Sequence, residues 1–228
     1  MRISRSKIEL YIECPRCFYF DVVMKKGRPS TFPLNLNIAV DTVLKREFDV
    51  YREMEVMHPI QREFQCDFIP AKHPMLENWR NIKNGGLSFE NKSHNCTYFG
   101  TIDDLWINSK GQYAIVDYKS TAKEKAVMEV PEFADGYIRQ LSFYNYLLKK
   151  NQINVIDNGF LVYATGVSNQ LRFDNQMKFI LTLIRVDLTE SWIESTLDSI
   201  YDLLKDSCIP NPSDSCRYCR FVDSRIVV

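Results

Sequence analysis

The sequence predicts an α/β fold, in which helices flank a central mixed sheet and a cysteine metal site joins the two chain ends. Two apolar-rich runs within residues 100–121 flank a polar turn that ends in Gly111, which is typical of a β-hairpin. Several other segments show apolar residues at helical spacing. Two Cys-x-x-Cys pairs, one near each end of the chain, could join the termini through a metal ion.

Composition narrows the class of protein. The chain has 228 residues, of which 45% are hydrophobic, and this is enough for one sizeable domain. Its 29 basic residues balance 29 acidic ones, so any contact with nucleic acid must come from local patches. We expect a cytoplasmic protein, because the sequence has no membrane-spanning run and no signal-like N-terminus. Its seven cysteines then favour thiols or metal ligands over disulfides.

Helix signals begin near the N-terminus. Ser6 and Glu9 fit a capping box, which predicts an N-terminal helix over about residues 6–23. Pro15 cannot continue a helix without a kink, so we expect a break and then a restart with Pro15 in the first turn. The restart places the two cysteines of the first pair, Cys14 and Cys17, about one turn apart on one face.

The rest of the chain alternates between predicted helices and strands. Apolar residues at helical spacing predict helices over residues 35–54, 131–151 and 189–204, the last with Thr189 as its N-cap. Runs of β-forming residues predict strands over residues 60–69, 87–95, 155–165 and 177–187. The remaining segments are a polar stretch with a short helix at 75–82 and a loop-like tail at 206–222. Three histidines outside any motif are interpreted as surface residues: His58, His73 and His94.

The hairpin brings acidic and basic side chains together. Side chains alternate along a strand, so Asp117 and Lys119 point to the same side, about 6–7 Å apart. Asp103 on the first strand can join them if the register or a bulge turns it to that face, whereas alternation sends Asp104 the other way. Two carboxylates and a lysine at the end of a hairpin are the parts of a hard-cation site with an activated water.

These residues resemble the core motif of the PD-(D/E)xK nucleases. Gly100 and Asp103, then a short hairpin, then Asp117 and Lys119 are similar to the RecB-like branch, which includes the CRISPR adaptation nucleases. The resemblance implies a restriction-endonuclease-like fold and a single nuclease domain over residues 1–228. It also implies that the two acids hold Mg²⁺ or Mn²⁺, while the lysine orients the attacking water or stabilises the developing negative charge.

Two other positions extend the resemblance. Gln140 and Tyr144 lie four residues apart on one helix face and are similar to the Gln-x-x-x-Tyr pair that follows the lysine in this branch. The resemblance implies that Gln140 positions the substrate or Lys119, with Tyr144 behind it; Tyr144 also fits an ordinary core stripe. Asp41 stands where the family often offers a histidine to the metal. Because of this departure, three roles stay open for Asp41: a metal ligand, an acid that contacts the ligands from behind, or a surface acid.

The cysteines resemble those of RecB-like nucleases that carry an iron–sulfur cluster. In those families one cysteine comes from an N-terminal Cys-Pro and three come from the tail, and the matches here are Cys14, Cys216 and Cys219. The last tail cysteine is missing, so Cys17 is the natural fourth ligand and Cys208 the second choice. Because four thiolates suit either metal, the centre is a 4Fe-4S cluster or a Zn²⁺ site.

The sequence therefore favours a metal-dependent DNA nuclease acting in repair, recombination or defence. The alternative is a non-catalytic module that retains the nuclease fold and binds nucleic acid or a partner protein. A third hypothesis is an unrelated enzyme whose fold is stabilised by a bound zinc ion. The sequence contains no helicase P-loop, so we expect any motor to be a separate chain.

Overall fold

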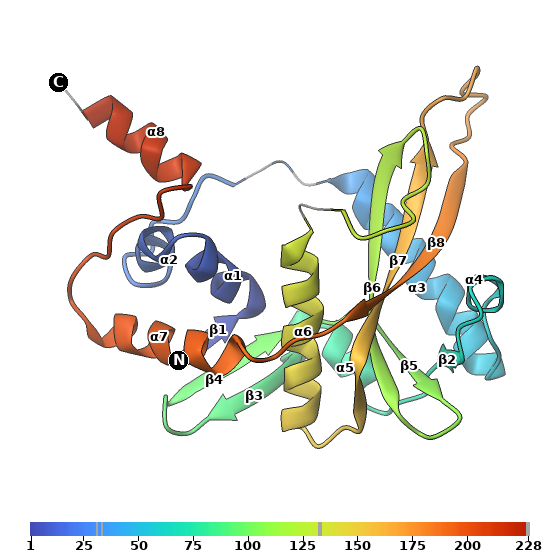
Figure 1. Cartoon of the computed structure of the whole chain (residues 1–228), viewed down its shortest axis with the longest axis horizontal. Coiled ribbons are helices and arrows are strands. Elements are labelled where there is room, and N and C mark those ends of the chain that lie inside the picture. Colours follow the sequence, from blue (N-terminus) through green and yellow to red (C-terminus); the bar gives the residue numbers. More distant parts are fainter. Residues whose placement is uncertain (31, 33, 132–133, 227–228) are drawn as a thin grey trace. The chain divides into compact units, whose positions relative to one another are not determined.

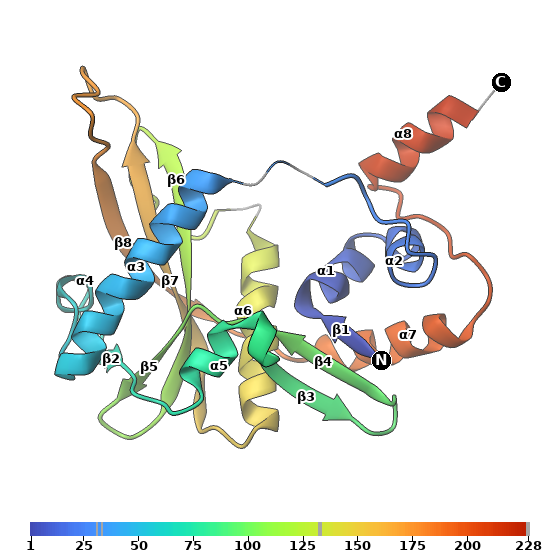
Figure 2. The same ribbon diagram turned by 180° about the vertical axis from the view of Figure 1, so that it is seen from behind.

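The computed structural model describes residues 1–30, 32, 34–131 and 134–226. The chain divides into two compact units, which are not contiguous in sequence. The sheet unit combines Pro33–Phe89 and Gly100–Thr189, and the terminal unit combines Met1–Phe32, Glu90–Phe99 and Glu190–Val228. Figures 1 and 2 show the elements of each unit from opposite sides.

The sheet unit is built on a five-stranded mixed sheet in the order β2-β5-β6-β7-β8. Strands β6 and β7 are parallel and the other neighbours are antiparallel. A parallel pair needs a crossover, which here includes the helix α6 (Asp135–Lys150). The strands are β2 (Phe68–Pro70), β5 (Asp104–Asn108), β6 (Tyr113–Lys123), β7 (Val155–Val167) and β8 (Phe179–Asp187). The predicted hairpin at 100–121 is confirmed as β5 and β6, and the two later predicted strands as β7 and β8.

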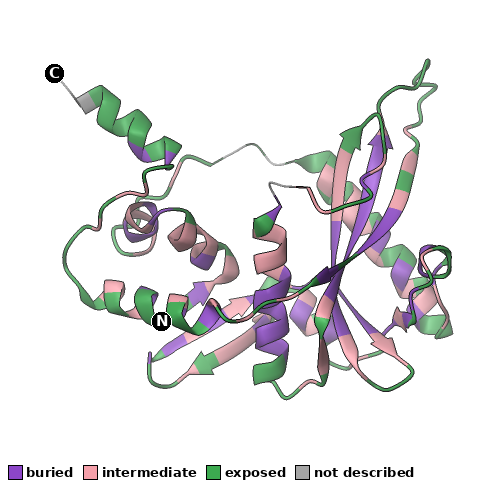
Figure 3. Ribbon diagram, in the orientation of Figure 1, coloured by how far each residue is buried: buried purple, intermediate pink, exposed green. Residues whose placement is uncertain are grey.

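Helices lie on both faces of this sheet, α6 on one and α3 (Asn35–Met54) on the other (Figures 1 and 2). The face toward α3 is an aromatic core in which Phe48 stacks against Trp106 and contacts Tyr118. Residues 114–118 of β6 and 159–166 of β7 are buried because helices cover both faces of these strands, whereas the strand ends are partly exposed (Figure 3). The α/β class and the flanked mixed sheet predicted from the sequence are confirmed, and α3 has the predicted bounds.

The terminal unit is mainly helical. Strand β1 (Arg2–Ser4) pairs in parallel with β4 (Cys96–Gly100), in a three-stranded sheet with the order β1-β4-β3 that ends at β3 (Leu87–Asn91). Its helices are α1 (Arg5–Glu13), α2 (Pro15–Val22), α7 (Ile193–Lys205) and α8 (Arg217–Ile226). The predicted break before Pro15 is confirmed, because Cys14 is extended and Pro15 takes the first position of α2.

Several local predictions are wrong. The first helix begins at Arg5 with Ser4 as N-cap, so Ser6 is not a cap; pairing of β1 with β4 holds the backbone extended up to Ser4. The predicted helix start at Thr189 is also wrong, since the backbone N–H of Thr189 donates to Ser142 Oγ and α7 begins at Ile193. The helix predicted from Pro131 begins at Asp135, and residues 132 and 133 lie outside the described part of the chain.

The segment around His58 differs most from its prediction. Residues 60–69 were expected to form one strand but contain the short helix α4 (Pro59–Glu63) and then β2. The cause is local, because the His58 ring accepts a hydrogen bond from the Ile60 N–H and Gln61 closes a capping box. His58 is therefore buried and stacks on Phe48 at 4.3 Å, contrary to the surface assignment.

Two further predictions are corrected in other segments. His94 is buried, stacks on Tyr201 at 4.4 Å and hydrogen-bonds to Tyr98, whereas His73 is half-buried. The tail is not loop throughout, since α8 begins directly after Cys216. The polar stretch 71–86 holds α5 (Leu76–Arg80) and a 3₁₀ turn (Ile82–Asn84), close to the short helix predicted there.

Gly100 at the end of β4 is required by close packing. A Cβ at this position would lie 2.4 Å from Cε1 of Tyr144 on α6. We predict that Gly100→Ala lowers the free energy of unfolding by about 1–3 kcal/mol, because the ring cannot retreat from a packed core. Urea denaturation measures the change. Lys110→Ala in the exposed hairpin turn serves as the control, and equal midpoints for the two variants would contradict the prediction.

Candidate active site and cysteine centre

Asp117 and Lys119 project from the same face of β6, toward α6. Asp117 is 2% exposed, and its Oδ2 lies 2.5 Å from Lys119 Nζ. Both residues lie in the part of β6 that runs parallel to β7. Strand β6 therefore holds the carboxylate of Asp117 and the ammonium group of Lys119 in direct contact.

Asp103 and Asp104 are adjacent in sequence but have different surroundings. Asp103 Oδ2 accepts a hydrogen bond of 3.0 Å from the backbone N–H of Tyr118, which places this acid beside the Asp117–Lys119 pair. Asp104 is fully buried and forms ion pairs with Arg52 and Arg80. Asp104 thus belongs to the core, whereas Asp103 belongs to the candidate site.

Gln140 on α6 links the site residues to one another. Its Nε2 donates to Asp117 Oδ1 at 2.8 Å and to the Tyr144 hydroxyl at 3.5 Å, and its Oε1 accepts from Lys119 Nζ at 3.4 Å. One amide group therefore contacts the acid, the base and the tyrosine behind them. The structure brings together five residues singled out from the sequence: Asp103, Asp117, Lys119, Gln140 and Tyr144.

Asp41 reaches this cluster through a residue that sequence reasoning missed. Lys45 Nζ on α3 lies 2.8 Å from Asp41 Oδ2 and 2.8 Å from Asp103 Oδ1. Asp41 and Lys45 are four residues apart on one helix face, a spacing that could have identified the pair. The connection of Lys45 to Asp103 depends on how α3 packs against the sheet, which local sequence does not reveal.

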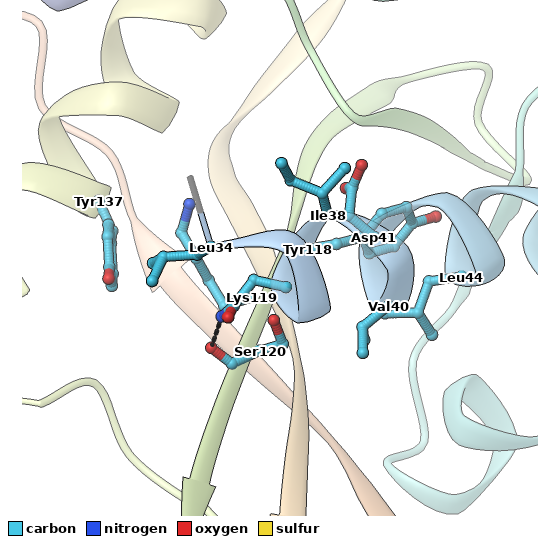
Figure 4. A pocket seen from close by; sticks show the side chains of 10 residues that line it. Leu34, Ile38, Val40, Asp41, Leu44, Tyr118, Lys119, Ser120 and Tyr137 are labelled. Atoms are coloured by element: carbon cyan, nitrogen blue, oxygen red, sulfur yellow. Dashed lines mark hydrogen bonds between the residues drawn. The ribbon is translucent and has the colours of Figure 1, made fainter. Parts of the chain in front are cut away.

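A cavity of about 290 Å³ opens beside these residues. Figure 4 shows Asp41 on α3 and Lys119 on β6 among the side chains that line it. Tyr137 forms a further wall, and Lys119 Nζ lies 4.4 Å from the centre of its ring. The lysine therefore stands at the boundary between the acid cluster and a space that a small part of a substrate could enter.

The acids of the site repel one another. Burial, followed by repulsion from Asp103, raises the pKa of Asp117 to about 7, although Lys119 opposes the shift. Burial and Asp103 likewise raise the pKa of Asp41. Burial would lower the pKa of Lys45, but attraction to Asp103 and Asp41 raises it overall. The site therefore concentrates negative charge that a bound cation would neutralise.

The donor set fits a hard divalent cation. Its available donors are carboxylate oxygens, which Mg²⁺ and Mn²⁺ prefer over nitrogen or sulfur. Asp117 Oδ2 is buried and, apart from its ion pair with Lys119, has no hydrogen-bond partner among the described residues. Asp103 and Asp117 would hold such an ion, and the carbonyl oxygen of Tyr118 could add a further ligand.

Four cysteines form a second candidate metal centre, within the terminal unit. The sulfur atoms of Cys14, Cys17, Cys216 and Cys219 all lie within 4.8 Å of one another, and all four residues are buried. The Sγ–Sγ distances are 3.6 Å for Cys17–Cys216, 3.7 Å for Cys17–Cys219 and 3.8 Å for Cys14–Cys219. Cys208 is exposed and lies outside this group, so Cys17 occupies the fourth position.

Arg28, also missed from the sequence, lies against the cysteines. Its Nη2 lies 3.8 Å from Cys216 Sγ, and its Nη1 donates to Glu13 Oε2 at 2.5 Å. Although burial opposes ionisation, the backbone N–H of Cys219 and the neighbouring thiols lower the pKa of Cys216 to about 6. One sulfur of the centre is thus favoured as a thiolate, the form that binds metal.

Comparison with known proteins identifies the family. The model of the PD-(D/E)XK nuclease superfamily matches residues 39–224, which is most of the chain. The chain therefore belongs to the PD-(D/E)XK nuclease superfamily, and the mixed sheet flanked by helices agrees with that fold.

Other comparisons add little. A solved structure titled "Crystal structure of SSO0001" is similar over 97% of this chain and 84% of that chain, with 14% identity and a TM-score of 0.39. None of the curated proteins compared with the chain matches it. Within the described residues, no helix is long and apolar enough to cross a bilayer.

The contrast between the two adjacent acids gives a prediction. Asp104→Asn should lower the free energy of unfolding by about 3–5 kcal/mol, because Arg52 and Arg80 lose their buried carboxylate and keep only carboxylates that are at least partly exposed. Asp103→Asn should change it by less than about 1 kcal/mol, because its ion pair with Lys45 is partly exposed. Chemical denaturation of both variants measures the difference, and the reverse ranking would show that Asp103 carries the structural role.

Proposed function

We propose that this protein is a RecB-like nuclease that uses Mg²⁺ or Mn²⁺ to hydrolyse phosphodiester bonds in DNA. Membership in the nuclease superfamily supports a nuclease-type activity. The observation that carries the finer proposal is the convergence of two acids and a lysine: Asp117 pairs with Lys119 at 2.5 Å, and Asp103 accepts a hydrogen bond from the backbone N–H of Tyr118, the residue between them. Both units together would form one nuclease domain over residues 1–228.

Each residue of the cluster has a role in this proposal. A bound metal would polarise the phosphate and lower the pKa of a water molecule, and Asp103 and Asp117 would hold it. Lys119 would orient that water or stabilise negative charge on the phosphate oxygens. Gln140 holds Asp117 and Lys119 at a fixed separation, and Tyr144 supports Gln140 from behind. The cavity beside Lys119 gives the substrate access to these groups.

The principal alternative is a non-catalytic module that binds nucleic acid or a partner. The retained contacts among acid, lysine and glutamine favour catalysis, because a binding module does not need a buried Asp117 beside Lys119. Cleavage of single- and double-stranded DNA with and without Mg²⁺ or Mn²⁺ separates the two functions. The alternative predicts binding without cleavage under every metal condition.

The first activity prediction concerns Asp117 and Lys119. Asp117→Asn and Lys119→Ala should each reduce the cleavage rate by about 10²–10³, because preorganised charge at the reacting phosphate is lost. Removal of divalent ions with EDTA should also reduce the cleavage rate. Asp157→Asn, which alters an exposed acid on β7, is the matched control. If Lys119→Ala cleaves DNA at the parental rate, this site assignment is incorrect.

For the cysteine centre we propose a single structural Zn²⁺ ion rather than a 4Fe-4S cluster. A tetrahedral ion with Zn–S bonds of about 2.3 Å requires sulfur atoms about 3.8 Å apart. Three of the six sulfur–sulfur separations are 3.6–3.8 Å and all six lie within 4.8 Å, which supports that size. A four-iron cluster has an iron atom behind each thiolate, so its cysteine sulfurs must stand farther apart. The pairing of two Cys-x-x-Cys segments supports the same conclusion.

We expect loss of this centre to lower the melting temperature of the protein rather than to act directly on the cleavage step. Freshly purified protein should be colourless and contain about one zinc per chain. Cys216→Ser should lose that zinc and lower the melting temperature by roughly 4–8 °C, equivalent to about 2 kcal/mol for a chain of this size. Cys208→Ser, at an exposed position outside the centre, should match the parent. Brown protein with iron and labile sulfide would instead support the cluster.

A further inference from the structure

Lys45 occupies an unusual position for a side chain of α3. Its ammonium group lies 2.8 Å from Asp103 Oδ1 and 2.8 Å from Asp41 Oδ2, so it bridges two acids from different elements. Asp103 Oδ2 is already occupied by the backbone N–H of Tyr118. Lys45 therefore covers the oxygen of Asp103 that a metal ion would use.

The charges of the site show why a lysine is placed there. The cluster contains three carboxylates and two lysines: Asp41, Asp103, Asp117, Lys45 and Lys119. Lys119 pairs with Asp117, which leaves Lys45 as the partner of both remaining acids. The ammonium group offsets the repulsion among acids that would otherwise face one another without a cation.

We infer that Lys45 is a built-in cation that competes with the divalent metal for Asp103 and thereby sets the metal affinity of the site. The inference rests on the proposed function, because it takes Asp103 as a metal ligand. Metal binding displaces the ammonium from Asp103, and Asp41 retains it through their ion pair on one helix face. Asp41 is thus the counter-ion of Lys45 and not a ligand of the metal.

Metal binding, measured without any substrate, tests this inference. Mn²⁺ is titrated into the full chain by calorimetry, with the same solutions followed by electron paramagnetic resonance of free Mn²⁺. Lys45→Met removes the competing charge and should tighten Mn²⁺ binding at least tenfold. Lys45→Arg keeps the charge and should bind Mn²⁺ within threefold of the parent. Lys72→Met, which removes an exposed lysine paired with Glu55, should leave the affinity unchanged.

A double-mutant cycle tests the role of Asp41. Asp41→Asn leaves Lys45 with Asp103 alone, so Mn²⁺ binding should weaken severalfold in the parent background. In the Lys45→Met background the same change should have no effect, because no ammonium remains to be redirected. A metal ligand would behave differently, since Asp41→Asn would then weaken binding in both backgrounds, and that result would overturn this part of the inference.

Thermal stability supplies a second readout. In EDTA, Lys45→Met should melt below the parent because its acids repel one another, and Mn²⁺ should raise its melting temperature more than it raises that of the parent. If Lys45→Met does not fold, Lys45→Gln serves in its place. The inference is overturned if the neutral variant binds Mn²⁺ no more tightly than the parent does.

Asp103→Asn separates this inference from the proposed function. If Asp103→Asn binds Mn²⁺ as tightly as the parent, the ligand assignment behind the proposed function is wrong. If Asp103→Asn loses binding while Lys45→Met binds like the parent, the proposed function stands and the role of Lys45 is wrong. Loss of binding in the first variant and tighter binding in the second support both.

Discussion

The buried carboxylate of Asp104 joins two helices of the sheet unit to its hairpin. It forms ion pairs with Arg52 of α3 and Arg80 of α5, and its Oδ2 accepts from the hydroxyl of Tyr118 on β6 at 2.7 Å. A charge so deeply buried is tolerated only because every side of it is occupied by a donor. These bonds fix two helices and both strands of the hairpin around one residue. With Asp104 committed to the core, its neighbour Asp103 is turned toward Asp117.

The sequence was most informative where one local pattern decides the structure. The hairpin follows from two apolar runs around a Gly turn, and α3 follows from its helical periodicity, so both were predicted with nearly correct bounds. The spacing of the cysteines similarly indicated which four thiols meet. Predictions failed where a distant partner or a competing cap decides the outcome. The β1–β4 pairing moved the first helix start, and the His58 capping box replaced the beginning of a strand.

The site was predictable to the extent that it lies on one hairpin and one helix face. Asp117 and Lys119 are fixed relative to each other by strand alternation, and Gln140 and Tyr144 by helical spacing. The contact of Lys45 with Asp103 and that of Arg28 with Cys216 escaped notice because these partners are distant in sequence and belong to no local motif. A charged residue in a helix or loop is ordinarily solvated, and only tertiary packing shows that Lys45 meets the acids of the site and that Arg28 meets the buried thiols.

The discontinuous terminal unit has a consequence for the order of events during synthesis on the ribosome. All of the sheet unit, residues 33–89 and 100–189, is translated before Cys216 and Cys219. The sheet can therefore assemble while Cys14 and Cys17 still carry only half of a thiolate site. Because domains fold as units during synthesis, the terminal unit can close only after residues 190–228 have left the ribosome, later than the sheet unit. Any metal ion that needs all four cysteines can thus be bound only after Cys219 has been translated.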